Sequence, residues 1–129
     1  MGSDATVALG ITGESLACAA LAERGYAILA RRYRTRNGEI DIVARDGPTL
    51  VFVEVKCRAS GACGHPAEAV TLRKQRRVVA MARRYLAERG LHGCLCRFDV
   101  VAVRFRGERP PAVEVIRDAF QAGWWAPPP

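Results

Sequence analysis

The apolar residues of the chain fall into short segments that are separated by residues typical of turns. Segments rich in β-branched and aromatic residues predict strands at 26–34, 39–44, 50–58 and 95–105, and a short fifth strand at 112–117. Turns are expected between them at Asn37-Gly38, Asp46-Gly47-Pro48 and 107–111. This pattern predicts a sheet whose first strands are joined by short connections.

Two further segments are predicted to be helices. The first is rich in alanine, with Thr12 as its expected N-cap and an end near Arg24, and residues 1–11 before it are expected to be frayed. The second is a long helix with Pro66 in its first turn and an end near Gly90.

The order of these elements predicts an α/β fold in one domain. The first three strands form an antiparallel meander, and the long helix crosses over so that the fourth strand joins parallel to a neighbour. We therefore expect a mixed β-sheet flanked by helices: a helix, a three-strand meander, a long crossover helix and one or two further strands. The 129 residues fit a single domain, expected at 1–120, with a flexible C-terminal tail at 121–129.

The third predicted strand has one apolar face and one face that turns charged. The apolar face carries alternate residues, among which Cys57 is expected to pack as a small hydrophobic side chain: Val51, Val53, Val55 and Cys57. The other face begins with Leu50 and Phe52 and continues with Glu54 and Lys56. A carboxylate and an amine therefore project from the same side of a strand whose other side belongs to the core.

The register of the hairpin decides whether Asp41, on the second strand, meets Glu54. A four-residue loop puts Asp41 directly opposite Glu54, and a two-residue loop at Asp46-Gly47 puts it opposite Phe52, diagonal to Glu54. A three-residue loop would turn Asp41 onto the apolar face opposite Val53, which burial disfavours. Either even-length loop brings the two carboxylates close together on one face.

Two close carboxylates repel each other and persist most readily when a cation lies between them. Mg²⁺ takes oxygen ligands, and Lys56 beside Asp41 and Glu54 would orient a metal-bound water or stabilise charge on a phosphate. Glu14 would be a third acidic group at the metal, or would simply interact with the N-terminus of its helix. From spacing alone, a surface cluster of ion pairs on an edge hairpin is the commoner alternative.

The long helix carries a lysine where an apolar stripe is expected. At about 100° per residue the stripe collects Ala67, Val70, Val78, Met81 and Tyr85. Lys74 falls in the middle of this stripe and Arg77 at its margin. A lysine there needs an anion or water, which the carboxylates of the sheet or a bound phosphate would supply; alternatively it extends past the edge of the core.

The charge balance favours an anionic partner. Lys and Arg number 20 against 13 Asp and Glu, a formal net charge of +7. Most of the positive charge is arginine, which binds phosphate through two hydrogen bonds, although a basic balance also aids solubility. The side chains expected to contact nucleic acid are Arg34, Arg36, Arg58, Arg73, Lys74 and Arg77.

Other function classes are disfavoured by what the chain lacks. No apolar run reaches the roughly 20 residues of a membrane span, and no signal peptide is visible, so a cytoplasmic protein without membrane contact is expected. An odd number of cysteines, five, favours free thiols. The spacings of Cys57, Cys63 and His65, and of His92, Cys94 and Cys96, are not those of usual structural zinc sites.

Taken together, these motifs resemble a known family over about residues 10–120. The segments that carry the resemblance are Gly13-Glu14, Gly25-Tyr26, RRYR at 31–34, GEIDIVA at 38–44, VFVEVKCR at 51–58, KQRR at 74–77 and RFDVV at 97–101. They look like the YraN family of bacterial proteins, which is distantly related to archaeal Holliday junction resolvases. The resemblance implies the restriction-endonuclease-like fold of PD-(D/E)xK proteins.

The resemblance also implies roles for individual residues. Asp41 matches the Asp of the motif, with Ile40 in place of the proline before it, and Glu54 and Lys56 match the (D/E)xK element. Two more matches extend the expected catalytic set: the helix-one glutamate is Glu14 and the basic helix position facing the site is Lys74. Mg²⁺ or Mn²⁺ is the expected cofactor, held by Asp41, Glu54 and the carbonyl of Val55.

Three functions are consistent with these residues. The first is a metal-dependent endonuclease or phosphodiesterase acting on DNA, branched or junction DNA included. The second is a non-catalytic module that binds nucleic acid or takes part in an assembly while keeping the nuclease fold. The third is a protein-interaction domain. Because related resolvases act as dimers, a homodimer is an expected state.

Overall fold

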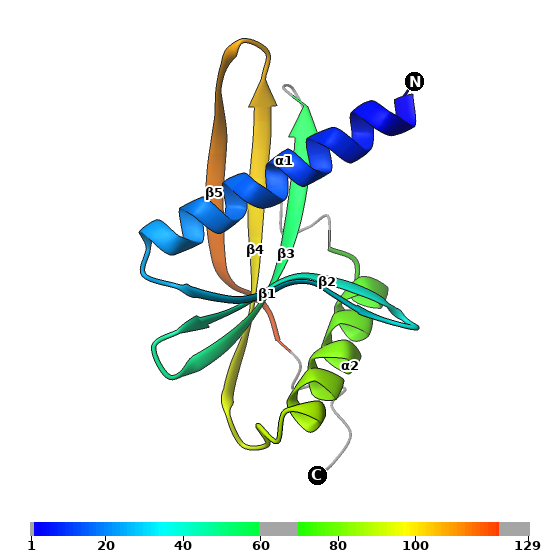
Figure 1. Cartoon of the computed structure of the whole chain (residues 1–129), viewed down its shortest axis with the longest axis vertical. Coiled ribbons are helices and arrows are strands. Elements are labelled where there is room, and N and C mark those ends of the chain that lie inside the picture. Colours follow the sequence, from blue (N-terminus) through cyan, green and yellow to red (C-terminus); the bar gives the residue numbers. More distant parts are fainter. Residues whose placement is uncertain (1, 60–69, 122–129) are drawn as a thin grey trace.

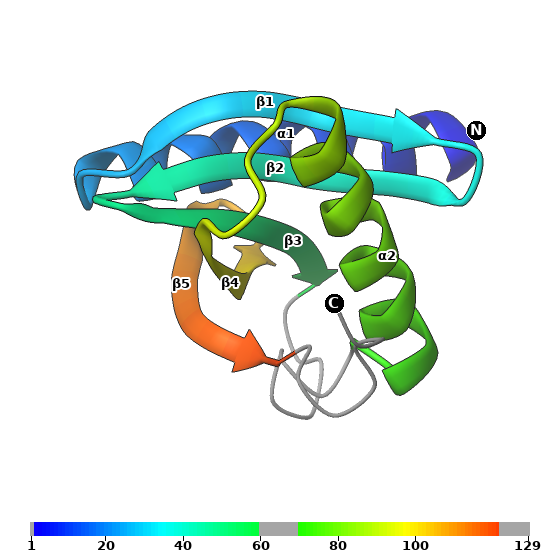
Figure 2. The same cartoon turned by 90° about the horizontal axis from the view of Figure 1, so that it is seen from below.

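The computed structural model describes residues 2–59 and 70–121. The elements along the chain are α1 (Gly2–Glu23), β1 (Ala27–Thr35), β2 (Gly38–Asp46), β3 (Thr49–Ala59), α2 (Leu72–Glu88), β4 (Leu95–Arg106) and β5 (Arg109–Phe120). The two helices pack on opposite faces of one sheet (Figures 1 and 2). Neither helix, over the described residues, is long and apolar enough to cross a membrane.

The sheet has five strands in the order β1-β2-β3-β4-β5. β3 and β4 are parallel, and the other neighbours are antiparallel. A parallel pair needs a crossover connection, and α2 lies in the connection between β3 and β4. The predicted α/β fold with a mixed sheet, a meander, a crossover helix and two further strands is therefore confirmed.

The two faces of β3 belong to two different cores. Phe52 packs against Tyr85 of α2 and stacks on Phe98, so the even residues of β3 face α2. Val51 and Val53 are buried with residues of α1, so the odd residues face that helix. The alternation predicted for this strand is confirmed, and it places Glu54 on the α2 side of the sheet.

The predicted start of the first helix at Thr12 is wrong. α1 begins at Gly2, so residues 2–11 are helical rather than frayed, and Thr12 lies inside the helix. A good capping residue permits a helix to begin but does not force it to, and the preceding residues contain no proline to break one. Glu14 is therefore far from the helix N-terminus, and the interaction predicted for it there is also wrong.

The second helix begins later than predicted. α2 starts at Leu72, and Thr71 is its N-cap, with a side-chain oxygen that accepts from the Lys74 amide at 3.2 Å. Pro66 lies outside the described residues, as do Ala67 of the predicted stripe and residues 122–129 of the predicted tail. Within the helix the rest of the stripe is confirmed, because these side chains are buried: Val78, Met81 and Tyr85.

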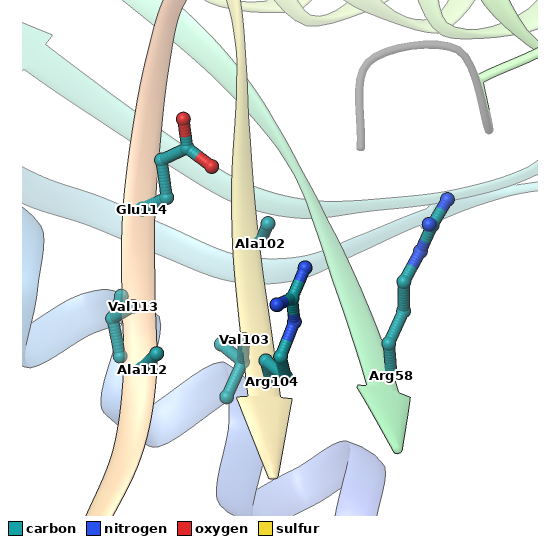
Figure 3. A pocket seen from close by; sticks show the side chains of 7 residues that line it. All are labelled: Arg58, Ala102, Val103, Arg104, Ala112, Val113 and Glu114. Atoms are coloured by element: carbon teal, nitrogen blue, oxygen red, sulfur yellow. The ribbon is translucent and has the colours of Figure 1, made fainter. Parts of the chain in front are cut away.

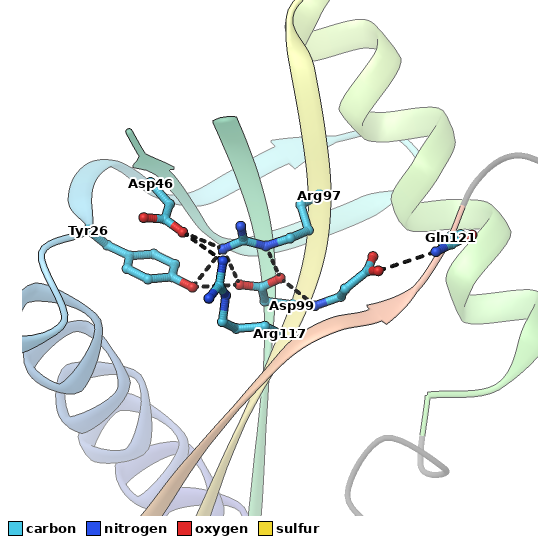
Figure 4. A network of polar contacts seen from close by, with 7 residues as sticks. Tyr26, Asp46, Arg97, Asp99, Arg117 and Gln121 are labelled. Carbon is cyan, nitrogen blue, oxygen red and sulfur yellow. Dashed lines mark hydrogen bonds and ion pairs between the residues drawn. The ribbon is translucent and has the colours of Figure 1, made fainter. Parts of the chain in front are cut away.

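A buried polar network ties the strands together at one end of the sheet (Figure 4). Asp99 of β4 is fully buried and accepts from Arg97 Nε at 2.9 Å and from the Tyr26 hydroxyl at 3.0 Å. The amide of Asp118 on β5 donates to the same carboxylate at 3.0 Å, and Arg97 also reaches Asp46 of the β2–β3 turn at 2.9 Å. Asp99 is therefore paired with a basic residue of its own strand.

Replacing Asp99 should destabilise the protein strongly. Asp99→Ala removes the acceptor of the buried Tyr26 hydroxyl and of the Asp118 amide, and one of the two carboxylate partners of Arg97, at a typical cost of about 1–3 kcal/mol for each group left without a partner. The matched control is Arg117→Ala, which removes only an exposed ion pair with Asp46 at 3.5 Å and should cost less than about 1 kcal/mol. Urea denaturation compares the free energies of unfolding, and equal losses for both variants would contradict the role given to Asp99.

Candidate active site

Asp41 and Glu54 face each other across the β2–β3 hairpin. The two strands pair from Asp46↔Thr49 to Ile42↔Val53, and one more step in this register sets Asp41 level with Glu54. This is the register predicted for a loop of four residues, Asp46 to Thr49. The loop itself is shorter, because Asp46 and Thr49 also pair and only Gly47 and Pro48 remain in the turn. The structure thus brings the two predicted carboxylates together.

The sheet stops being regular where Asp41 lies. The pairing of β2 with β3 ends at Ile42↔Val53, and β3 then diverges from β2 (Figure 2). The Val55 amide, which has no partner on β2, donates to Asp41 Oδ2 at 2.8 Å. The carboxylate therefore takes the place of a backbone acceptor and is fixed in position by the strand that carries Glu54.

A twist in the β1–β2 arm accompanies this divergence. Ile40 packs in the core on the α2 side, whereas Ile42 packs in the core on the α1 side. Their partners on β1 are Tyr33 and Arg31, and the residue between those two, Arg32, has a φ of 53° in the left-handed region. A non-glycine residue adopts this conformation at some cost, so the arm is held twisted by its surroundings.

Glu54 is a carboxylate that the fold buries without full compensation. Its side chain is 5% exposed, and Lys74 Nζ lies 3.4 Å from Oε2. That distance is an ion pair, yet Oε2 accepts no hydrogen bond among the described residues. Of the alternatives left open for Lys74, the structure bears out the one in which a carboxylate of the sheet, here Glu54, is its partner. An oxygen left in this state is suited to binding a cation.

Asp41 resists ionisation in this environment. Burial, and after it the neighbouring Glu54 carboxylate, raises the pKa of Asp41 from its ordinary 3.8 to about 8. The Val55 amide and the charge of Lys74 oppose this shift. The pair of carboxyl groups therefore retains a proton near neutral pH unless a further positive charge joins them.

Two more glutamates lie close to Asp41, one on α1 and one on β2 itself. Glu14 of α1, Glu39 of β2 and Asp41 each offer a carboxylate oxygen within 4.8 Å of the others. Arg31 and Arg32 of β1 hold Glu14, with Nε atoms 3.0 and 3.2 Å from its oxygens. Asp41 thus stands between Glu54 on one side and two glutamates on the other. This all-oxygen donor set fits a hard divalent cation such as Mg²⁺ or Mn²⁺.

Glu39 was not among the predicted site residues. The signal was its place two residues before Asp41, which in a regular strand puts both side chains on one face. Its pairing with Arg34 at 3.4 Å also shows that one of the arginines expected to contact nucleic acid lies beside the acidic cluster. Sequence spacing alone gave no reason to select it over other surface glutamates.

The remaining predicted side chains surround this centre. Lys56 is half-buried and follows Glu54 on the same face of β3, and Arg58 follows Lys56. Arg36 is exposed in the β1–β2 turn, and Arg73 and Arg77 are exposed on α2. Contact of these residues with nucleic acid, and a metal bond to the Val55 carbonyl, stay predictions.

The described cysteines belong to α1, to β3 and to the residues at the start of β4. Free thiols are confirmed for the described cysteines, which are Cys18, Cys57, Cys94 and Cys96. Cys63 and His65 of the zinc pattern lie outside the described residues. Burial of Cys57 was predicted wrongly: it is exposed, because the end of β3 extends beyond the core that covers Val51 and Val53.

Gly13 sets the distance between α1 and the site. A Cβ at this position would lie 2.1 Å from Cys57 Sγ. The close approach of α1 to β3 at this point therefore requires glycine at position 13. The next residue on the helix is Glu14. The absence of a side chain at position 13 therefore brings the Glu14 carboxylate within reach of Asp41.

Gly13→Ala should have opposite effects in two backgrounds. In the native chain the new methyl group overlaps Cys57 Sγ, and overpacking of this kind costs about 1–3 kcal/mol. In a Cys57→Ala background the nearest atom is Cβ of residue 57 at 3.7 Å, an ordinary contact, and the higher helix propensity of alanine should then stabilise by up to about 1 kcal/mol. Urea denaturation of the four proteins measures the coupling, and the same change in both backgrounds would exclude the contact.

The raised pKa of Asp41 predicts a pH dependence of stability. Between its ordinary pKa of 3.8 and about 8, the folded state holds a proton that the unfolded chain releases. The contribution of Asp41 to the free energy of unfolding, measured in EDTA, should therefore be highest below about pH 4. It should fall as the pH rises to about 8. Asp41→Asn should remove this fall and stabilise the protein at pH 8, whereas the control Glu23→Gln, exposed at the end of α1, should not. An unchanged pH profile of Asp41→Asn would refute the assignment.

Comparison with known proteins places the chain in a family. The model of the uncharacterised protein family UPF0102 matches residues 13–103. UPF0102 proteins of Chlorobium phaeobacteroides, Anaeromyxobacter dehalogenans and Moorella thermoacetica are 45%, 55% and 53% identical to it. The matched regions cover 88%, 91% and 86% of this chain and 94%, 87% and 93% of theirs. The chain therefore belongs to the uncharacterised protein family UPF0102, the YraN family that its motifs resemble.

Proposed function

We propose that this protein is a divalent-metal-dependent phosphodiesterase that cleaves DNA. The observation that carries the proposal is the buried Glu54, whose Oε2 accepts no hydrogen bond among the described residues while a second carboxyl group, Asp41, lies opposite. Burying a pair of carboxyl groups costs free energy, and a bound cation would offset that cost by neutralising their charge. Asp41, Glu54 and the Val55 carbonyl would be the ligands.

The side chains around the proposed metal ion would then have different roles in the reaction. A bound divalent ion supplies Lewis acidity and lowers the pKa of a coordinated water. Lys56, on the same face as Glu54, would place its ammonium group beside the scissile phosphate, where it stabilises the charge that develops on the oxygens. Lys74 forms an ion pair with Glu54, and the two arginines on Glu14 hold that carboxylate near Asp41.

The proposed substrate follows from charge and from the family resemblance. A net charge of +7 favours a polyanion, and several arginines lie around the acidic centre. The similarity of the motifs to junction resolvases favours branched DNA, which a homodimer would bind with two-fold symmetry. The cytoplasm, where bacterial DNA lies, is the compartment that we expect.

A second candidate is a DNA-binding module without catalysis. The observation that favours it is the ion pair of Lys74 with Glu54 at 3.4 Å, because the lysine supplies a cation to the pair without any metal. In that case the basic surface would still bind DNA, and neither carboxylate would be required for the activity of the protein.

Loss of the site residues should abolish cleavage and spare binding. Purified protein is incubated with linear, nicked, flapped and four-way DNA in Mg²⁺ or Mn²⁺. Asp41→Ala, Glu54→Gln and Lys56→Ala should each lower the cleavage rate by about 100-fold or more, since each removes a charge needed in the transition state. The control Glu23→Gln should cleave at the native rate.

Calorimetry with Mn²⁺ separates the two candidate functions. The first requires metal binding that Asp41→Ala abolishes. DNA binding by the native protein with neither metal binding nor cleavage would select the second candidate, and cleavage that survives Asp41→Ala would rule out this site as its source.

A further inference from the structure

A hollow of about 190 Å³ lies on the sheet farther along β3 than Glu54 and Lys56. It is lined by Arg58, Ala102, Val103, Arg104, Ala112, Val113 and Glu114 (Figure 3). α2 packs over the part of this face that holds Phe52 and Phe98, so the helix does not fill the hollow. The floor is low because Ala102 and Ala112 have small side chains.

The strand registers place the charged residues of the hollow on the face of the active site. Glu54, Lys56 and Arg58 are alternate residues of one strand, so their side chains share a side. Arg58 pairs with Arg104 on β4, and Ala102 pairs with Glu114 on β5. Figure 3 shows the side chains of both arginines and of Glu114 projecting to the same side of three neighbouring strands.

Two guanidinium groups in register on adjacent strands repel each other, because the strands are only about 4.8 Å apart. The Arg104 side chain is exposed and makes no hydrogen bond or ion pair within residues 2–59 and 70–121. The charged residues that line the hollow are two arginines and one glutamate. An anion with several oxygens would relieve the repulsion and accept from both groups.

We propose that this hollow binds a second phosphate group of the DNA substrate, one that does not directly neighbour the cleaved phosphate. The inference rests on the proposed function, since the cleaved phosphate is the one at Asp41 and Glu54. Arg58 is the fourth residue after Glu54 on β3, which places it about 13 Å farther along at 3.3 Å per residue. That is too far for both sites to hold one phosphate, so Arg58 and Arg104 position the strand and take no part in the chemistry.

Arg104→Ala and Glu114→Gln test the hollow in opposite directions. Binding of fluorescein-labelled linear and four-way DNA is measured by anisotropy in EDTA, over a range of salt concentrations. Arg104→Ala should weaken binding about three- to tenfold and reduce the slope of log K against log salt by about 1. Glu114→Gln removes the opposing charge and should strengthen binding. The matched control is Arg24→Ala, an exposed arginine directly after α1, the helix on the other side of the sheet.

The outcomes separate the hollow from the nuclease. If Arg104→Ala binds DNA with the affinity and salt slope of Arg24→Ala, the proposal is overturned even if the native protein cleaves DNA. If Arg104→Ala weakens DNA binding and reduces its salt slope, but neither the native protein nor any variant cleaves DNA in Mn²⁺, the phosphate site stands and the proposed nuclease activity fails. A native protein that binds no DNA at low salt overturns both. Thermal denaturation of each variant confirms that it is folded.

Discussion

The hydrogen bond from the Val55 amide to the Asp41 carboxylate is the contact on which the arrangement of the site depends. Where β2 leaves β3, a backbone N–H loses its acceptor, and a buried N–H without one is costly. A side chain of β2 supplies the acceptor, so one oxygen of Asp41 completes the sheet while the group as a whole faces Glu54. The irregularity of the sheet and the closeness of the carboxylates have the same origin.

The protein combines an unfavourable site with a strongly bonded sheet end. At the site, the buried Glu54 lies near the partly buried Asp41 and pairs with Lys74, and the twisted arm holds Arg32 at a positive φ. At the other end, Asp99 accepts from Tyr26, Arg97 and the Asp118 amide, so a fully buried carboxylate there is well compensated. Proteins commonly concentrate strain and imperfectly paired charges where they function, and the rest of the fold stabilises them.

Much of the fold was predictable because its signals are local. The alternation along 50–58 determined both faces of β3, and Lys74 on an apolar stripe correctly required an anion. The start of α1 was not predictable, since Thr12 is a good cap that the helix passes through. Glu39 was missed because its nearness to Glu14 depends on how α1 crosses the sheet. The contacts of Asp99 with Tyr26 and with the Asp118 amide are equally non-local.

The parallel pairing of β3 with β4 has a consequence for the order in which the protein is made. Both predicted metal-binding carboxylates are synthesised early, on β2 and β3, but β3 gains its second neighbour only after α2 and β4 have left the ribosome. Until then the strand carrying Glu54 has an open edge and lacks the helix that brings Lys74. Such long-range pairing slows folding. A nascent or truncated chain therefore holds the acidic residues without the assembled centre, and any activity belongs to the finished molecule alone.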